Sequence, residues 1–220
     1  SRGINYISIV NENIVWGTSY DGSGSGDNVQ EFTRTNNSGD TWNSGTIDIS
    51  NESLGISMIH AYDYNKAWLV AYPRATGDTG GIFQTTDGGS TWNRQDSANY
   101  DTSSSFANVV YFWDENVGFA QGDPINGEFE LYVTSDGGNN WSQVPGSSIP
   151  NPLTGEYGYT RQIEVVGDNV WYSTNRGRLY HSTDRGNNWS VYDTPISDFG
   201  SAEVNGDASF SDANNGIIVD

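Results

Sequence analysis

The chain lacks cysteine altogether. None of its 220 residues is a cysteine, so the sequence excludes a disulfide framework, a thiolate metal site and a cysteine nucleophile. Small secreted eukaryotic scaffolds normally depend on disulfides, and the absence of cysteine argues against that class. It is compatible with a protein that a bacterium exports.

Positive charge is almost as scarce. The chain has 9 lysine and arginine residues against 28 aspartate and glutamate residues, which gives a net charge of −19, and Lys66 is the only lysine. A surface of this sign repels phosphate backbones and anionic lipid. We therefore expect neither nucleic-acid binding nor binding to a membrane surface.

Long hydrophobic runs are missing too. No apolar run approaches the roughly 18 residues that a membrane span needs, and the opening SRGINYISIV has no charged start followed by an apolar stretch. We therefore expect no membrane insertion. The abundance of Asn, Ser, Thr, Gly and aromatic residues is typical of extracellular proteins, so we expect a protein that is secreted or held at the outer cell surface.

A nine-residue segment recurs four times. The copies are TNNSGDTWN at Thr35–Asn43, TTDGGSTWN at Thr85–Asn93, TSDGGNNWS at Thr134–Ser142 and STDRGNNWS at Ser182–Ser190. Their tryptophans, Trp42, Trp92, Trp141 and Trp189, are separated by 50, 49 and 48 residues. A period near 50 with strand-like contents predicts an all-β fold, a β-propeller in which each repeat is one four-stranded antiparallel blade.

The sequence between these segments supports the same fold. A pair of short apolar strands joined by an Asp, Asn or Gly turn returns in step, as in YISIVNENIVWGTS and MIHAYDYNKAWLVA. A third strand leads into each nine-residue segment, and a fourth begins at its tryptophan. The predicted blade units are residues 1–48, 49–98, 99–147 and 148–196, followed by the start of a further blade at 197–220.

We call the four nine-residue segments the box turns. Their residue types are those of a structural turn, without any ligand. The third residue of each copy, Asn37, Asp87, Asp136 or Asp184, is expected to accept backbone N–H bonds, and the glycine permits a positive φ. The tryptophan then leaves the turn to pack between sheets. We therefore expect all four tryptophans to be largely buried.

The box turns resemble the Asp-box, or bacterial neuraminidase repeat, of sialidases, xyloglucanases, sortilin-like receptors and photosystem II assembly-factor-like propellers. The resemblance implies the propeller fold but no activity, because these families share the box and not a function. The stretches GDPINGEFELYVTSDGGNNW, PLTGEYGYTRQ and TNRGRLYHSTDRG also resemble large exported propeller proteins of Bacteroidetes, which commonly end in a type IX secretion sorting domain. That resemblance implies a secreted or surface protein of a Gram-negative bacterium, with the type IX secretion machinery as a partner during export.

Each predicted blade consists of a first hairpin and a second hairpin that contains the box turn, and the two kinds of hairpin do not occur in equal numbers. The sequence has five copies of the first hairpin but four box turns, and it stops at GIIVD, inside the second strand of a fifth blade. A closed four-bladed propeller needs equal numbers of both halves. We therefore expect residues 1–220 to form about four and a third blades of a ring of six to eight blades.

Ligand-binding loops are expected at the end of the blades opposite the box turns. Aromatic rings, guanidinium groups and a carboxylate in these loops make seven residues candidates for binding a glycan or protein partner: Tyr72, Arg74, Asp123, Tyr157, Tyr159, Arg161 and Arg176. Rings stack on apolar ligand faces, and a guanidinium group holds a carboxylate with two hydrogen bonds. The alternative is that the arginines pair with surface acids and the tyrosines pack against loop edges.

The sequence indicates no metal site and no cofactor. The stretch DGSGSGDN, beginning at Asp21, resembles the start of a calcium loop, but Phe32 stands where the closing bidentate Glu belongs, so we expect a flexible loop. His60 and His181 lie in separate predicted strands, and we expect them to be ordinary strand residues rather than zinc ligands.

The sequence assigns no catalytic residues. A sialidase needs three converging arginines, for which Arg74, Arg161 and Arg176 are the conceivable trio, but the Arg-Ile-Pro start and the Tyr/Glu pair of that family are absent. A xyloglucanase-like hydrolase needs two opposed carboxylates, and Asp123 is the most suggestively placed acid. The favoured hypothesis is a non-enzymatic, exported or cell-surface module that presents a loop face to a glycan or protein. The alternative is a fragment of a propeller glycoside hydrolase.

Overall fold

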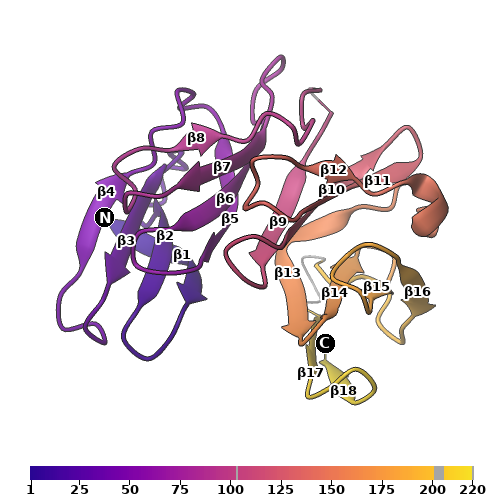
Figure 1. Ribbon diagram of the computed structural model, residues 1–220. Helices are drawn as coiled ribbons and strands as arrows, with labels where there is room; N and C mark the ends of the chain where they lie inside the picture. Colours follow the sequence, from indigo (N-terminus) through magenta and orange to yellow (C-terminus); the bar gives the residue numbers. More distant parts are fainter. Residues whose placement is uncertain (103, 201–205, 220) are drawn as a thin grey trace.

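The computed structural model describes residues 1–102, 104–200 and 206–219. These residues form four antiparallel sheets of four strands each and one two-stranded hairpin. Figure 1 shows the sheets fanned around a common centre, with β1, β5, β9 and β13 nearest to it and β4, β8, β12 and β16 at the outside. The predicted fold is confirmed: the chain is an all-β partial propeller.

Strands follow one another in chain order across every sheet. The first blade consists of β1 (Arg2–Ile9), β2 (Val15–Asp21), β3 (Glu31–Thr35) and β4 (Asn43–Thr46). The second consists of β5 (Gly55–Ala61), β6 (Ala67–Tyr72), β7 (Gly81–Thr85) and β8 (Asn93–Arg94). The third consists of β9 (Ala107–Phe112), β10 (Gly118–Ile125), β11 (Glu128–Thr134) and β12 (Ser142–Gln143). The fourth consists of β13 (Gly158–Val166), β14 (Asn169–Thr174), β15 (Arg178–Ser182) and β16 (Ser190–Asp193). The hairpin is β17 (Asp207–Phe210) and β18 (Gly216–Val219), and the helical element of the described residues is the 3-10 turn η1 (Gly146–Ser148).

The inner strands share an irregularity near their first residues. The pairing of β1 with β2 skips Asn5, that of β5 with β6 skips Ser57, and that of β9 with β10 skips Asn108. In β13 the break is longer and runs from Gly158 to Ile163. Such bulges bend a strand and re-aim its side chains, and here they recur at the centre of the fan.

The box turns are built by side-chain hydrogen bonds to their own backbone. In the second blade, Gly89 N–H donates to Thr85 Oγ1 at 2.8 Å and Thr91 N–H donates to Asp87 Oδ1 at 2.9 Å. The other three copies repeat both bonds. Gly89 has φ +86°, and a Cβ there would lie 2.2 Å from the Phe32 ring of the first blade. The turn therefore needs glycine both for its conformation and for its neighbour.

The expectation that every box tryptophan is buried is wrong for one copy. Trp92, Trp141 and Trp189 are 7%, 5% and 7% exposed, whereas Trp42 is 48% exposed. The reason is that a box tryptophan packs on the blade before its own: Trp92 contacts Trp16 of the first blade, with ring centroids 6.4 Å apart. No described blade precedes the first one, so nothing covers Trp42.

The core lies between neighbouring blades. Trp68 of β6 stacks on Phe112 of β9 at 3.5 Å between ring centroids, and Phe129 of β11 packs edge-on against Tyr180 of β15 at 5.0 Å. Large rings of this kind each bury about 150–250 Å² and dominate the energetics of a core. The blades therefore stabilise one another, and the loops at their ends stand on rigid sheets.

Candidate ligand-binding site

The seven candidate residues lie at one end of the blades. The opposite end carries the box turns together with the turns that join first to second strands, as shown by the bonds from Ser38 N–H to Asn13 O and from Gly88 N–H to Asn65 O. Tyr72 ends β6 and Arg74 follows it, Asp123 lies near the end of β10, and Arg176 lies between β14 and β15. Tyr157 lies directly before β13, and Tyr159 and Arg161 lie within the first four residues of that strand.

Two tyrosines of this end form a shelf with a carboxylate. The rings of Tyr157 and Tyr159 meet edge to face with centroids 5.5 Å apart, and Tyr157 is 42% exposed. The Tyr159 hydroxyl donates a hydrogen bond to Asp198. Burial and this bond to a carboxylate raise the pKa of Tyr159. We call Tyr157, Tyr159 and Asp198 the tyrosine shelf, and it combines an exposed aromatic ring with a carboxylate.

The backbone under the exposed ring is fastened to the neighbouring turn. Tyr157 N–H donates to Asn175 Oδ1 at 2.8 Å, and Asn175 N–H donates back to the Tyr157 carbonyl at 3.1 Å. The Asn175 side-chain amide also donates to the Gly155 carbonyl at 3.0 Å. These bonds hold Tyr157 in place before any ligand arrives, which lowers the entropic cost of binding.

A buried ion pair anchors the same loop from below. Glu156 accepts hydrogen bonds from Arg178 Nη1, from the Thr174 hydroxyl and from Leu153 N–H, each at 2.7 Å. The Glu156 side chain is fully buried and that of Arg178 is 9% exposed. Such a pair is costly to break, since removing one partner leaves an uncompensated buried charge.

A buried polar cluster lies directly beneath the shelf. Asp123 Oδ1 accepts from Asn108 Nδ2 at 2.7 Å and from the N–H of Gly158, the residue between the two tyrosines, at 3.0 Å. Burial raises the pKa of Asp123 to about 6, although both hydrogen bonds oppose the rise. Asn108 Oδ1 and Gln121 Oε1 are buried without a hydrogen-bond partner among the described residues. Asn108, Gln121 and Asp123 therefore form an acceptor-rich layer, which we call the buried polar cluster.

A second carboxyl group lies close to this cluster. Glu130 pairs with Gly122, the residue before Asp123, across β10 and β11, and it is 5% exposed. Burial raises the pKa of Glu130 to about 7, and the charges of Asp101 and Asp123 add to the rise. Both carboxyl groups are thus poised to gain or lose a proton near neutral pH.

The arginines of this end make separate structural contacts. Arg161 Nη1 donates to the Asn5 carbonyl at 3.0 Å and to Asn5 Oδ1 at 2.7 Å, which joins β13 to β1. Arg161 also has φ +69°, at the register break of β13. Arg176 Nη2 donates to the Thr154 carbonyl at 2.8 Å, and Arg74 is exposed. No contact among the described residues brings these three guanidinium groups together.

The Tyr72 ring packs against a residue of a neighbouring loop. Its ring stacks on Phe106 with centroids 4.4 Å apart, and it is partly buried. Phe106 in turn accepts the backbone N–H of Asp123 at 2.9 Å through its carbonyl. Tyr72 therefore supports the loop next to the buried polar cluster.

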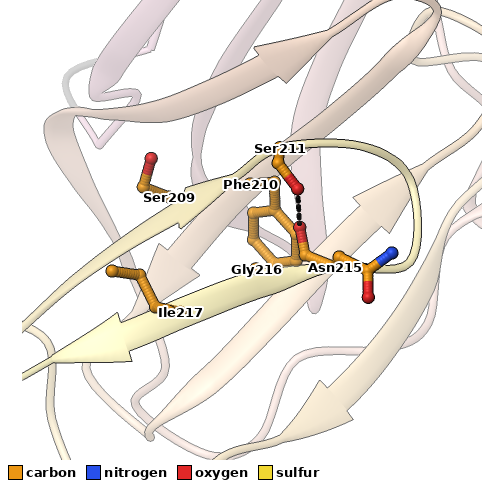
Figure 2. A pocket seen from close by; sticks show the side chains of 6 residues that line it. All are labelled: Ser209, Phe210, Ser211, Asn215, Gly216 and Ile217. Carbon is orange, nitrogen blue, oxygen red and sulfur yellow. Dashed lines mark hydrogen bonds between the residues drawn. The ribbon is translucent and has the colours of Figure 1, made fainter.

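Two of the cavities in the described residues lie beside β13 or on the β17–β18 hairpin. One of about 450 Å³ opens between β13 and β17 and is lined by Arg161, Gln162 and Glu164 together with Asp207 and Ser209. Figure 2 shows another, of about 410 Å³, on the β17–β18 hairpin, where Phe210 lies between the strands and Ser211 Oγ donates to the Asn215 carbonyl at 3.2 Å. The cavity on the β17–β18 hairpin is an open face of that hairpin. The cavity between β13 and β17 is the one that Arg161, a candidate residue, helps to line.

The other sequence features are structural in the described residues. The His60 ring packs at a tilt against Tyr111, with centroids 4.5 Å apart, and burial lowers the pKa of His60 to about 4. His181 stacks on Trp171 at 4.4 Å. The Asp21 carboxylate accepts bonds from Ser23, Ser25 and Gly26, and so organises its own loop. In residues 1–102, 104–200 and 206–219, no three His, Cys, Asp or Glu residues are placed to hold a metal, and no helix is long and apolar enough to cross a membrane.

Sequence reasoning missed the supporting residues of the site. Asp198, Asn175 and Glu156 hold the shelf and its loop, and Asn108 and Gln121 lie beneath it. Only Glu156 could have been suspected from the sequence, because it is an acid in a long Pro- and Gly-rich loop and an arginine, Arg178, follows within the same predicted blade. For the others the sequence holds no signal, because their partners lie on different blades or loops.

Comparisons with known proteins support the fold. No protein-family model matches the chain. Among curated proteins, vacuolar protein sorting/targeting protein 10 of Paracoccidioides brasiliensis is 29% identical over 92 residues, which cover 39% of this chain and 6% of that protein. The corresponding protein of Paracoccidioides lutzii matches over the same shares. The chain thus corresponds to a small part of these relatives.

Solved structures match over most of the chain. The structure of YCF48 bound to D1 peptide has a TM-score of 0.61 at 14% identity and covers 99% of this chain, which spans 64% of that one. The GH74 xyloglucanase from Xanthomonas campestris has a TM-score of 0.58 at 16% identity, with coverages of 88% and 31%. Trypanosoma rangeli sialidase has a TM-score of 0.55 at 13% identity, with coverages of 95% and 42%. At these identities the matches show the propeller fold alone, which hosts both enzymes and non-enzymatic proteins.

Proposed function

We propose that this chain is the binding module of a non-enzymatic β-propeller protein that a Gram-negative bacterium exports or displays on its surface. Its partner is a glycan or a protein, bound at the tyrosine shelf. The observation that carries this proposal is the exposed Tyr157 ring, fixed in place by Asn175 and set beside the acceptor Asp198.

The chemistry of the shelf favours a glycan without negative charge. Tyrosine rings stack on the apolar face of a sugar, and carboxylates accept bonds from its hydroxyl groups. The arginines Arg161 and Arg176 already bind backbone carbonyls, so the site offers little to an anion. The net charge of −19 also repels anionic ligands at long range.

The proposal that the protein is exported rests on the box turns and on the sequence around them. The four box turns have the residue pattern of the Asp-box, and their shared hydrogen bonds support that assignment. The likeness of the surrounding sequence to exported Bacteroidetes propellers adds the type IX secretion machinery as a partner during export. Detection of the protein in the culture medium or on intact cells tests this part of the proposal.

Binding is tested with variants of the shelf. Neutral oligosaccharides from plant and bacterial cell walls are screened on an array, and hits are measured by calorimetry. Tyr157→Ala should weaken binding at least about tenfold, because it removes the stacking surface, whereas Tyr157→Phe should keep most of it. Tyr192→Ala is the matched control, since Tyr192 is 56% exposed on β16, at the outer edge of the fourth blade. Equal effects of Tyr157→Ala and Tyr192→Ala would contradict the proposed site.

A glycoside hydrolase is the second candidate, favoured by the neighbouring carboxyl groups of Asp123 and Glu130. Glycoside hydrolysis usually needs one protonated and one ionised carboxyl group flanking the scissile bond. Both groups here are largely buried, which argues for a structural role. Release of reducing sugar or sialic acid by the protein, abolished by both Asp123→Asn and Glu130→Gln, would establish the enzyme and overturn the binding proposal.

A further inference from the structure

Two side-chain oxygens of the buried polar cluster lack a partner. Asn108 Oδ1 and Gln121 Oε1 accept no hydrogen bond from the described residues. Asn108 is 1% exposed and Gln121 is 0% exposed, so bulk water does not reach them freely. Leaving a buried acceptor unpartnered is costly, and such groups in folded proteins are usually satisfied by ordered water or by an ion.

The amide groups of these two residues have already used a donor. Asn108 Nδ2 donates to Asp123 Oδ1 at 2.7 Å, and Gln121 Nε2 donates to the Gly122 carbonyl at 2.9 Å. The amide oxygens that remain can only accept. They therefore need a positive or hydrogen-bond-donating partner that the cluster itself does not supply.

The three side chains of the cluster meet at Gly158. Gly158 N–H donates to Asp123 Oδ1 at 3.0 Å, and this is the same oxygen that Asn108 reaches. A Cβ on Gly158 would lie 2.5 Å from Gln121 Nε2 and 3.2 Å from Gln121 Oε1, so the Gln121 amide lies directly against the Gly158 backbone. One carboxylate and two amide groups are thus gathered in one place, where the third blade meets the fourth.

The carboxylate of this cluster has no positive partner. The ion pairs of the described residues include neither Asp123 nor the nearby Glu130. Burial raises the pKa of both carboxyl groups, as expected for negative charge without compensation. Buried charges in proteins are normally paired or coordinate a metal ion. A cation would satisfy the carboxylate and the amide oxygens together, whereas a water molecule would leave the charge uncompensated.

We infer that Asn108 Oδ1, Gln121 Oε1 and a carboxylate oxygen of Asp123 are ligands of one calcium ion. Calcium takes oxygen ligands, about six to eight of them, in an adaptable geometry. Asp123 is half-buried, so water on its open side completes the coordination. Magnesium fits less well, because it demands a near-octahedral set and gives up its own water reluctantly.

The ligand set is mostly neutral. It holds a single carboxylate, which agrees with the absence of three clustered His, Cys, Asp or Glu residues from the part of the chain that the structure describes. Calcium affinity falls as ligand charge falls, so we expect a dissociation constant of about 10⁻⁴ to 10⁻³ M. The Asp21 loop is the other place that resembles a calcium site, and its carboxylate is already bonded within the loop.

The ion lies directly under the tyrosine shelf. It holds Asp123, and Asp123 holds the N–H of Gly158 between Tyr157 and Tyr159. Calcium therefore stabilises the loop that carries the shelf, whatever ligand the shelf binds.

Calcium binding is measured on residues 1–220 without any glycan, so that the result does not depend on the proposed function. Melting temperatures are recorded with calcium chloride at about 10 mM, at least tenfold above the expected dissociation constant, with the same concentration of magnesium chloride, and with a chelator. Sodium chloride is adjusted to keep the ionic strength constant. Tyrosine-sensitised luminescence of terbium, an ion that occupies calcium sites, reports binding directly.

Calcium should raise the melting temperature of the parent by about 2 to 5 °C over the chelator, and magnesium should raise it by less than half as much. Asp123→Asn removes the charge, and Gln121→Met removes an amide oxygen at similar volume. Each should abolish the calcium shift and weaken terbium binding at least about tenfold. Asp21→Asn is the matched control and should keep both responses.

Four outcomes would overturn the inference. They are no calcium shift in the parent, an equal shift with magnesium, a shift that survives both Asp123→Asn and Gln121→Met, and a shift that only Asp21→Asn removes. Circular dichroism and melting in the chelator establish that each variant folds. Gln121→Met keeps the test decisive if Asp123→Asn does not fold, because it adds no charge and removes an unpartnered acceptor.

Discussion

Carboxyl groups in this protein occupy two opposite environments. In the box turns they are exposed or half-buried and accept several hydrogen bonds, so that the Thr91 hydroxyl and backbone N–H lower the pKa of Asp87 to about 2. Beneath the tyrosine shelf Asp123 is half-buried and Glu130 is buried, and burial raises the pKa of Asp123 to about 6 and of Glu130 to about 7. Protonation of the box-turn carboxylates therefore destabilises the folded chain, whereas protonation of Asp123 and Glu130 stabilises it.

The first prediction at this scale is a maximum of stability in weakly acidic solution. Between about pH 4 and pH 7 the folded chain holds protons on Asp123 and Glu130 that the unfolded chain has released, so stability rises as the pH falls from 7. Below about pH 4 the unfolded chain takes up protons before Asp87 does, and stability falls toward pH 2. Melting temperatures measured from pH 3 to pH 8 should peak between about pH 4 and pH 6.

The Asp123→Asn variant tests the cause of this peak. Its amide cannot lose a proton, so the slope between about pH 5 and pH 7 should become shallower. Asp96→Asn is the control, since the Asp96 side chain is 85% exposed. A slope unchanged by Asp123→Asn would show that the buried polar cluster does not govern the pH response.

At the scale of elements, the strands and box turns were predictable because their signals are local. Each box turn bonds to its own backbone, so Asp87 and Gly89 reveal it without knowledge of any other segment. The burial of a box tryptophan is not local, since it depends on the preceding blade, and Trp42 shows the consequence.

The candidate site was predictable only in part. Tyr157 and Tyr159 stand out because aromatic residues cluster in one loop. Asp198 and Asn108 do not, because the first reaches the shelf from the loop that follows β16 and the second lies in β9 of another blade. Their positions follow from how blades pack, which spacing along the chain does not encode.

An element-scale prediction concerns the loop that carries Tyr157. Glu156→Ala should destabilise the protein by about 3 to 5 kcal/mol, because it leaves Arg178 buried and unpaired. It should also weaken ligand binding by freeing the loop. The measurement is urea unfolding of the variant and the parent, with calorimetry for binding.

Two further variants sharpen this test. The double variant Glu156→Met/Arg178→Met should recover part of the lost stability, because an apolar pair of similar volume leaves no buried charge. Arg176→Ala is the control, since Arg176 is exposed on the same turn, and its effect should stay within about 1 kcal/mol. A double variant less stable than Glu156→Ala would contradict the explanation.

At the scale of the whole molecule, the imbalance of charge acts on every blade at once. The 28 acidic residues outnumber the basic ones by 19, and among the described residues the pair of Glu156 and Arg178 is the most buried ion pair. The remaining negative charge is spread over the surface, where it keeps molecules apart but also repels itself within one molecule.

The whole-molecule prediction is that salt stabilises this protein. Raising the sodium chloride concentration from 0.01 M to 0.5 M shortens the Debye length from about 30 Å to about 4 Å and screens this repulsion. The melting temperature at pH 7 should therefore rise by several degrees. At pH 4, where most of the net charge has been titrated away, the same change should have little effect. A melting temperature that falls with salt at pH 7 would mean that attractive ion pairs outweigh the repulsion.

The bridge from Arg161 to Asn5 bears on the order in which the protein folds. Within each sheet the hydrogen-bonded strands are neighbours in the chain, so each blade can pair its strands as soon as its own residues are available. The bridge instead joins residues 156 positions apart. On the ribosome the first strand must therefore wait, already paired on one edge, until the fourth blade emerges and brings its guanidinium group to the hub. Blade formation follows synthesis, and the consolidation of the centre comes last.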